Sequence, residues 1–70
     1  MTIILTDHAK KRMVERAVSF KQIQETIEMP DYTIQKEHKT EAYKRHSNKM
    51  LKVVYAAKDK YIKVITLVWK

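Results

Sequence analysis

The sequence predicts a single α+β domain in which two N-terminal helices pack on an antiparallel meander of about four strands. Its 70 residues are the length of one domain. Apolar residues recur at helical spacing in the first half of the chain. After Pro30 the pattern changes to the alternation and the Val and Tyr enrichment that are typical of strands. Short turns between consecutive strands favour antiparallel neighbours.

The first helix is expected from Thr6 to about Arg16. The Thr6 side chain can cap its N-terminus, and the helix dipole favours Asp7 in the first turn. An apolar stripe recurs every fourth residue and predicts the buried face. The stripe comprises Ala9, Met13 and Ala17.

A second helix is expected to begin at Ser19, which has the spacing of a capping box with Gln22. Pro30 disfavours helical geometry at Met29 and therefore ends this helix. Two short helices with so short a connection are expected to pack as a helical hairpin. The predicted buried face of the second helix comprises Phe20, Ile23 and Ile27.

Four strands are expected after the helices, and residues 2–5 are a candidate for a further short edge strand. In the last strand Ile62, Val64 and Val68 are predicted on one face and Ile65, Leu67 and Trp69 on the other. One face should pack on the helices, and the other is available to a second copy in a homodimer or as the floor of a shallow groove. The four strands are expected over residues 32–36, 42–46, 50–57 and 61–69.

The composition restricts the classes of function. The chain has no cysteine, which excludes disulfides, thiolate chemistry and Cys-based zinc sites. The N-terminal apolar run is too short for a signal peptide or a membrane span, so a cytoplasmic protein without membrane association is expected. The acidic residues form no paired motif for Mg²⁺, and the histidines lack the spacing of zinc ligands. No metal and no cofactor are predicted.

The formal net charge is +7 and is unevenly distributed. Residues 36–60 carry eight positive and three negative groups, whereas residues 19–35 carry one positive and three negative groups. An asymmetric field of this kind can steer RNA or another polyanion to one side of a protein. A lysine-rich solvated surface explains the same charge equally well.

Three basic residues of the first helix, His8, Arg12 and Arg16, are spaced four apart. Each step of four rotates about 40° around a helix, so the three form one connected strip beside the apolar stripe. We call this strip the basic ridge and expect it to face the middle strands around Arg45 and Lys52. The alternative to a functional role is that these three residues are the ordinary polar border beside the buried stripe of a helix.

The run from His8 to Ser19 resembles the signature of a family of small prokaryotic domains of unknown function, which read His-Ala, then Arg-Met, then Arg-Gly-Ile/Val-Ser. Met29-Pro30 and the last strand with Thr66 extend the resemblance over nearly the whole chain. That family is placed near the RelE/ParE and BrnT toxins, which implies a RelE/BrnT-like fold. It also implies a toxin-type domain neutralised by an antitoxin protein. The family usually has Gly where this chain has Ala17, and Ala in a left-handed conformation costs about 1 kcal/mol.

Some toxins of this group cleave RNA without a metal, which requires a base, an acid and cations for the phosphoryl oxygens. Histidine exchanges protons near neutral pH, and arginine clamps phosphate in bidentate fashion. The basic ridge therefore supplies the catalytic candidates His8, Arg12 and Arg16. Each strand candidate also has an ordinary alternative as an exposed or packed side chain. The candidates for nucleic-acid binding on the strands are Arg45, His46, Lys52, Tyr55 and Thr66.

Three hypotheses remain open. The first is a toxin-type domain that binds RNA and cleaves it, the second is a non-catalytic nucleic-acid-binding module, and the third is a protein-interaction domain. Phe20 and Trp69 are assigned to the core, so the sheet is not expected to offer aromatic side chains for stacking on bases.

Overall fold

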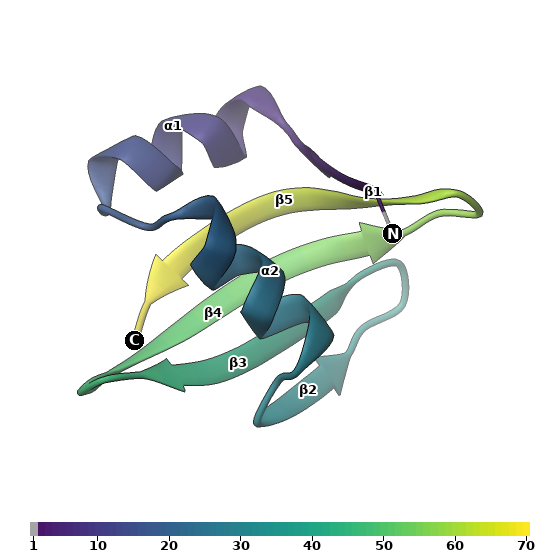
Figure 1. Ribbon diagram of the computed structural model, residues 1–70. Helices are drawn as coiled ribbons and strands as arrows, with labels where there is room; N and C mark the ends of the chain where they lie inside the picture. The colour runs from purple at the N-terminus through teal and green to yellow at the C-terminus, as the bar shows by residue number, and fades with distance from the viewer. Residues whose placement is uncertain (1) are drawn as a thin grey trace.

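The computed structural model describes residues 2–70, which form two helices and one five-stranded sheet (Figure 1). The strands lie in the order β1-β5-β4-β3-β2. In chain order the elements are β1 (Thr2–Leu5), α1 (Asp7–Glu15), α2 (Phe20–Glu28), β2 (Tyr32–Gln35), β3 (Thr40–His46), β4 (Lys49–Ala57) and β5 (Tyr61–Trp69).

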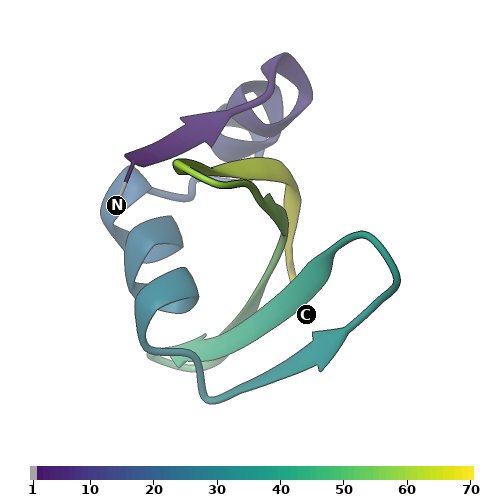
Figure 2. The same ribbon diagram turned by 90° about the vertical axis from the view of Figure 1, so that its right-hand side faces the viewer.

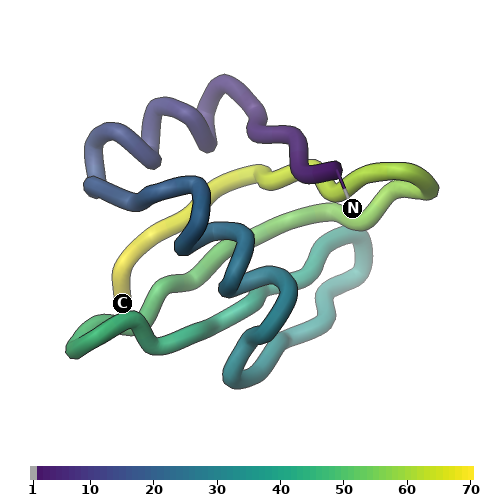
Figure 3. The backbone as a smooth tube through the Cα atoms, viewed as in Figure 1, coloured from purple at the N-terminus to yellow at the C-terminus, as the bar shows by residue number. Residues whose placement is uncertain are grey.

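The predicted arrangement, two N-terminal helices on a four-stranded antiparallel meander, was wrong. A strand precedes the helices: β1 pairs in parallel with β5, with Thr2 opposite Tyr61 and Leu5 opposite Val64, and this makes the sheet mixed and five-stranded. Figure 3 shows β1 running beside the beginning of β5 at the other end of the chain. The pairing is stabilised because Ile3 and Leu5 pack against the hydrophobic core.

A β-bulge in β5 decides which of its side chains face the helices. Val54 pairs with Thr66 and Tyr55 pairs with Val64, so Ile65 has no partner in this register. One extra residue shifts the alternation of the strand. Val64 and Leu67, three residues apart, are therefore both fully buried on the helix side, and the alternation predicted for this strand was wrong beyond the bulge.

The core lies between the helices and one face of the sheet (Figure 2). Its centre is formed by side chains with no exposed surface from α2, β4 and β5, which are Ile23, Leu51, Val53, Val64 and Leu67. Among residues 2–70 no helix covers the opposite face of the sheet, which we call the helix-free face. By strand alternation and register this face carries Glu41, Tyr43, Arg45, Lys52, Val54, Lys63, Thr66 and Val68.

The caps of both helices confirm the sequence prediction. The Thr6 hydroxyl accepts a hydrogen bond from the Ala9 amide, and Ser19 and Gln22 form a capping box. The prediction for Phe20 was wrong, because its side chain is 43% exposed. The buried Thr26 completes the packed face of α2 beside Ile23 and Ile27.

The connection between the helices contains a residue in the left-handed region, Ala17, with φ of 53°. The Val18 amide donates to the Met13 carbonyl and the Ala17 amide donates to the Val14 carbonyl, which is the hydrogen-bond pattern of a Schellman motif. Val18 then enters the core, where it is 4% exposed. The chain thus keeps the turn for which glycine is preferred, at the cost of a strained alanine.

Replacing Ala17 with glycine should stabilise the domain by about 0.5–1 kcal/mol, because glycine adopts this conformation without a Cβ clash. The midpoint of thermal unfolding should rise by about 2–8 °C. Ala57→Gly is the matched control, since Ala57 is exposed at the end of β4, and it should lower stability. A lower midpoint for Ala17→Gly than for the unmodified protein would contradict this account of the turn.

Candidate functional site

The basic ridge lies along β5 and not, as expected, against the middle strands. Among residues 2–70, β1 pairs with Tyr61 to Val64 and no other strand lies on that side of β5, so the second half of β5 has a free edge there. Helix α1 occupies this position (Figure 1), and its N-cap and C-cap residues bind the free edge of β5. The Thr6 hydroxyl donates to the Ile65 carbonyl over 3.1 Å, and Arg16 Nη1 donates to the Leu67 carbonyl over 2.6 Å.

Arg16 is held by two hydrogen bonds that join α1 to β5. Besides the bond from its guanidinium to Leu67, its own carbonyl accepts a hydrogen bond of 2.7 Å from the Trp69 indole. The side chain replaces a missing neighbouring strand by satisfying a carbonyl at the sheet edge. We therefore assign Arg16 to positioning the helix.

Removing the Arg16 side chain should lower the free energy of unfolding by about 1.5–3 kcal/mol, the contribution of a hydrogen bond from a charged donor. Urea denaturation of Arg16→Ala measures this loss. Arg12→Ala is the matched control one turn earlier on the ridge, and it should change stability much less because its ion pair is at the surface. Equal stability losses for the two variants would contradict the structural role of Arg16.

Arg12 forms an ion pair with Glu15 on the surface of α1. The hydrogen bond from the Arg12 guanidinium lowers the pKa of Glu15, and the charges of Lys11 and Arg16 lower it further. Glu15 therefore stays ionised and compensates part of the ridge's charge. The Arg12 side chain remains 29% exposed and within reach of a ligand.

His8 connects the ridge to the helix-free face. Its Nε2 atom lies 3.2 Å from the Thr66 hydroxyl, and this contact is exposed. Thr66 and Lys52 are diagonal neighbours on that face, because Thr66 pairs with Val54 and Lys52 pairs with Val68. The structure thus brings His8, Thr66 and Lys52 to one open surface.

Two of the predicted strand residues lie on the other side of the sheet. The Thr26 hydroxyl donates to the Gln22 carbonyl and so accepts from His46 Nε2, which lies 2.9 Å away. The His46 ring also meets the Trp69 ring edge-on, with 6.2 Å between centroids. Tyr55 packs against the core. Neither side chain shares a surface with His8.

The remaining predicted residue, Arg45, is exposed on the helix-free face beside Met50. Its backbone amide donates to Asp31 Oδ2 over 2.9 Å, which holds the end of β3 against the turn that leads into β2. Its guanidinium adds a positive charge to the same face as Lys52.

The helix-free face carries an aromatic pair that the sequence pattern did not predict. Tyr32 and Tyr43 are register partners on β2 and β3, and their rings stack with centroids 4.6 Å apart. The signal in the sequence is a tyrosine near the start of one expected strand and another within the next strand. Their distance in the sequence does not show that the two are opposite, because that depends on the register.

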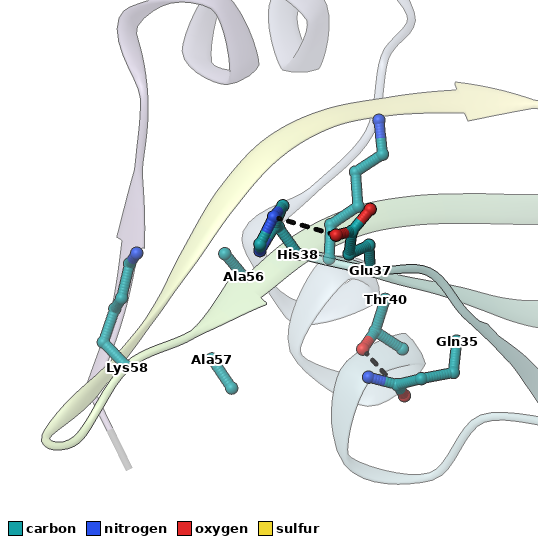
Figure 4. Close-up of a pocket in the computed structure, with 8 residues that line it drawn as sticks. Gln35, Glu37, His38, Thr40, Ala56, Ala57 and Lys58 are labelled. Atoms are coloured by element: carbon teal, nitrogen blue, oxygen red, sulfur yellow. Dashed lines mark hydrogen bonds and ion pairs between the residues drawn. The ribbon is translucent and has the colours of Figure 1, made fainter.

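A shallow pocket of about 330 Å³ lies elsewhere, between the β2–β3 loop and the end of β4 (Figure 4). In it His38 Nε2 is 3.7 Å from a Glu37 carboxylate oxygen, and the Thr40 hydroxyl donates to Gln35 Oε1 over 3.2 Å. Both side chains of the His38–Glu37 pair are almost fully exposed. None of the predicted site residues lines this pocket.

Within residues 2–70, no group of three His, Cys, Asp or Glu side chains is placed to hold a metal ion. In the same part of the chain, neither helix has the length and apolar character needed to cross a membrane.

Comparison with known proteins identifies one related group. The model of the family described as Domain of unknown function (DUF4258) matches residues 5–69, which include both helices and the strands β2 to β5. No curated protein and no solved structure matches the chain significantly.

Proposed function

We propose that this chain, which belongs to the DUF4258 family, binds the phosphate backbone of single-stranded RNA on its helix-free face, along the border with α1. The observation that carries the proposal is the exposed contact between His8 Nε2 and Thr66 Oγ1. It places an imidazole of the basic ridge at the rim of an open sheet surface, where a backbone phosphate can approach both the ridge and the strands.

The charges of the helix-free face support this proposal. Three strand cations, Arg45, Lys52 and Lys63, share it with one strand carboxylate, Glu41. Lys52 Nζ lies 3.7 Å from a Glu41 carboxylate oxygen, and the Lys52 side chain keeps 23% of its surface exposed, so it can contact a phosphate while it remains paired. Arginine and lysine provide most protein contacts to phosphate, and the net charge of +7 favours approach of a polyanion.

Cleavage of the bound RNA without a metal is a second candidate function, favoured by the exposure of His8. In this reaction the ribose 2′-oxygen bonds to the adjacent phosphorus while the bond from phosphorus to the 5′-oxygen breaks. The 2′-hydroxyl proton passes to His8, and the leaving oxygen takes a proton from water. Arg12 stabilises the charge on the phosphoryl oxygens, and the products are a 2′,3′-cyclic phosphate and a 5′-hydroxyl.

The His8–Ser19 run resembles a family that is placed near the RelE/ParE and BrnT toxins, and this resemblance adds support for RNA as the ligand. On this proposal the domain acts in the cytoplasm as a toxin-type protein, and a partner antitoxin neutralises it. The antitoxin would have to cover the helix-free face or the basic ridge, because RNA is proposed to bind there.

Fluorescence anisotropy with a labelled RNA hexamer tests binding. The unmodified protein should bind at low salt, and Arg12→Gln and Lys52→Gln should each weaken binding. Lys21→Gln is the matched control, because Lys21 is exposed on α2 and the substitution changes the net charge by the same amount. Equal weakening by all three variants would show that only the total charge matters and would contradict a site on the helix-free face.

Incubation of the purified protein with the same RNA in EDTA tests cleavage. Products with cyclic phosphate ends that disappear in His8→Gln, while this variant still binds RNA, would support the second candidate. Intact RNA after prolonged incubation with the unmodified protein would exclude cleavage and leave the binding proposal standing.

A further inference from the structure

The stacked tyrosines stand at the opposite border of the helix-free face from His8. Tyr32 lies on the edge strand β2 and is 49% exposed, whereas Tyr43 on β3 is 7% exposed. Their rings are nearly parallel, with 10° between planes. Tyr43 thus covers one side of the Tyr32 ring.

The inner ring of the stack is fixed by polar contacts. The Tyr43 hydroxyl donates to Glu41 Oε1 over 3.1 Å, and Lys52 Nζ lies 6.0 Å from the centre of the Tyr43 ring and 3.7 Å from Glu41. Burial raises the pKa of Tyr43, and its hydrogen bond to Glu41 raises it further, so the hydroxyl remains a donor. The stack is therefore an ordered aromatic surface next to a cation.

From this geometry we infer that Tyr32 stacks on a nucleobase of the bound RNA, so that the ligand is recognised through an unpaired base as well as through phosphates. This inference rests on the proposed function. Bases stack on exposed aromatic side chains in proteins that bind single strands, and a neighbouring cation contacts the backbone. A base that occupies the uncovered side of the Tyr32 ring would extend the existing pair to a stack of three rings.

The dimensions of the sheet fit a short single strand. Successive register partners on adjacent strands form rows across the sheet. One row runs from Tyr32 through Tyr43 and Lys52 to Val68, and the neighbouring row on the same face ends at Thr66. Three strand separations from β2 to β5 span about 14 Å. A strand of a few nucleotides can therefore place one base on Tyr32 and a phosphate near Lys52, and continue to His8.

Charge argues against a second copy of this chain as the occupant of the same surface. Two copies would each bring a net charge of +7, and the helix-free face itself carries more cations than carboxylates. A polyanion with exposed bases complements both the charge and the aromatic ring.

Two RNA hexamers of equal length and label test the inference, one with all bases and one with abasic sites throughout. Tyr32→Leu keeps an apolar cross-strand contact but removes the ring, and it should weaken binding of the base-containing hexamer by about 5- to 150-fold. Tyr32→Phe keeps the ring and should bind like the unmodified protein. Binding of the abasic hexamer should be the same for all three proteins.

The outcomes separate this inference from the proposed function. If Tyr32→Leu binds both hexamers like the unmodified protein, stacking is wrong while phosphate binding stands. If the unmodified protein binds neither hexamer, both proposals are wrong. If light scattering shows a dimer that Tyr32→Leu dissociates, the tyrosines form a protein interface and the stacking inference is overturned.

Discussion

Raising the salt concentration from 50 to 200 mM should weaken binding of a single-stranded RNA hexamer by about 20- to 50-fold. This range is expected if the hexamer contacts three or four cations, because each neutralised phosphate of a single strand contributes about 0.7 to the logarithmic salt slope. The strand cations of the helix-free face, Arg45, Lys52 and Lys63, together with Arg12, supply that number. Anisotropy titrations at several salt concentrations measure the slope.

The variants of the binding experiment test which lysine contributes to the salt slope. Lys52→Gln should reduce the slope by about 0.7, because one phosphate contact is lost, whereas Lys21→Gln on α2 should leave it unchanged. An affinity that does not change with salt would contradict a phosphate-binding surface. Titration with a DNA hexamer of the same sequence measures how much of the affinity depends on the ribose.

Replacing Leu67 with alanine should lower the free energy of unfolding by about 2–5 kcal/mol. Leu67 has no exposed surface, pairs with Val53 at the centre of the sheet, and lies in the core between the sheet and both helices. The total free energy of unfolding of an ordinary domain is about 5–15 kcal/mol. Short chains bury the smallest share of their surface when they fold. A domain with about 5 kcal/mol would keep about 0–3 kcal/mol after this change, so the urea midpoint of the variant should fall far below that of the unmodified protein, which circular dichroism measures.

Val14→Ala is the matched control for this prediction. Val14 is 84% exposed on α1, so its truncation creates no cavity, and alanine favours the helix. A loss below about 1 kcal/mol for Leu67→Ala would contradict the description of the core, because large-to-small changes at fully buried leucines cost more.

Local features of the fold were predictable from the sequence because their causes are local. The Thr6 cap and the Ser19–Gln22 capping box depend on residues within one turn, and Pro30 ends α2 by steric restriction of the preceding residue. The sheet depends on distant pairings. Neither the parallel pairing of β1 with the last strand nor the bulge at Ile65 leaves a signal in the local pattern.

In the candidate site, too, only the features with local causes were predictable from the sequence. The four-residue spacing of His8, Arg12 and Arg16 predicted that they follow one another along one helix. In the structure His8 and Arg12 lie in α1 and Arg16 is its C-cap. It did not show that Arg16 bonds to a sheet edge or that His46 faces the helices, because both contacts depend on tertiary packing. The Tyr32–Tyr43 stack depends on strand register, which the sequence alone does not determine.

The most direct test of the central claim is to follow the backbone amide signals of ¹⁵N-labelled protein by NMR while an RNA hexamer is added. We predict shifts at His8, Lys52 and Thr66, and at Tyr32 if the base stacks there, with little change along the exposed side of α2. Shifts confined to α2 or to the pocket around His38, or no shifts at saturating RNA, would contradict RNA binding on the helix-free face.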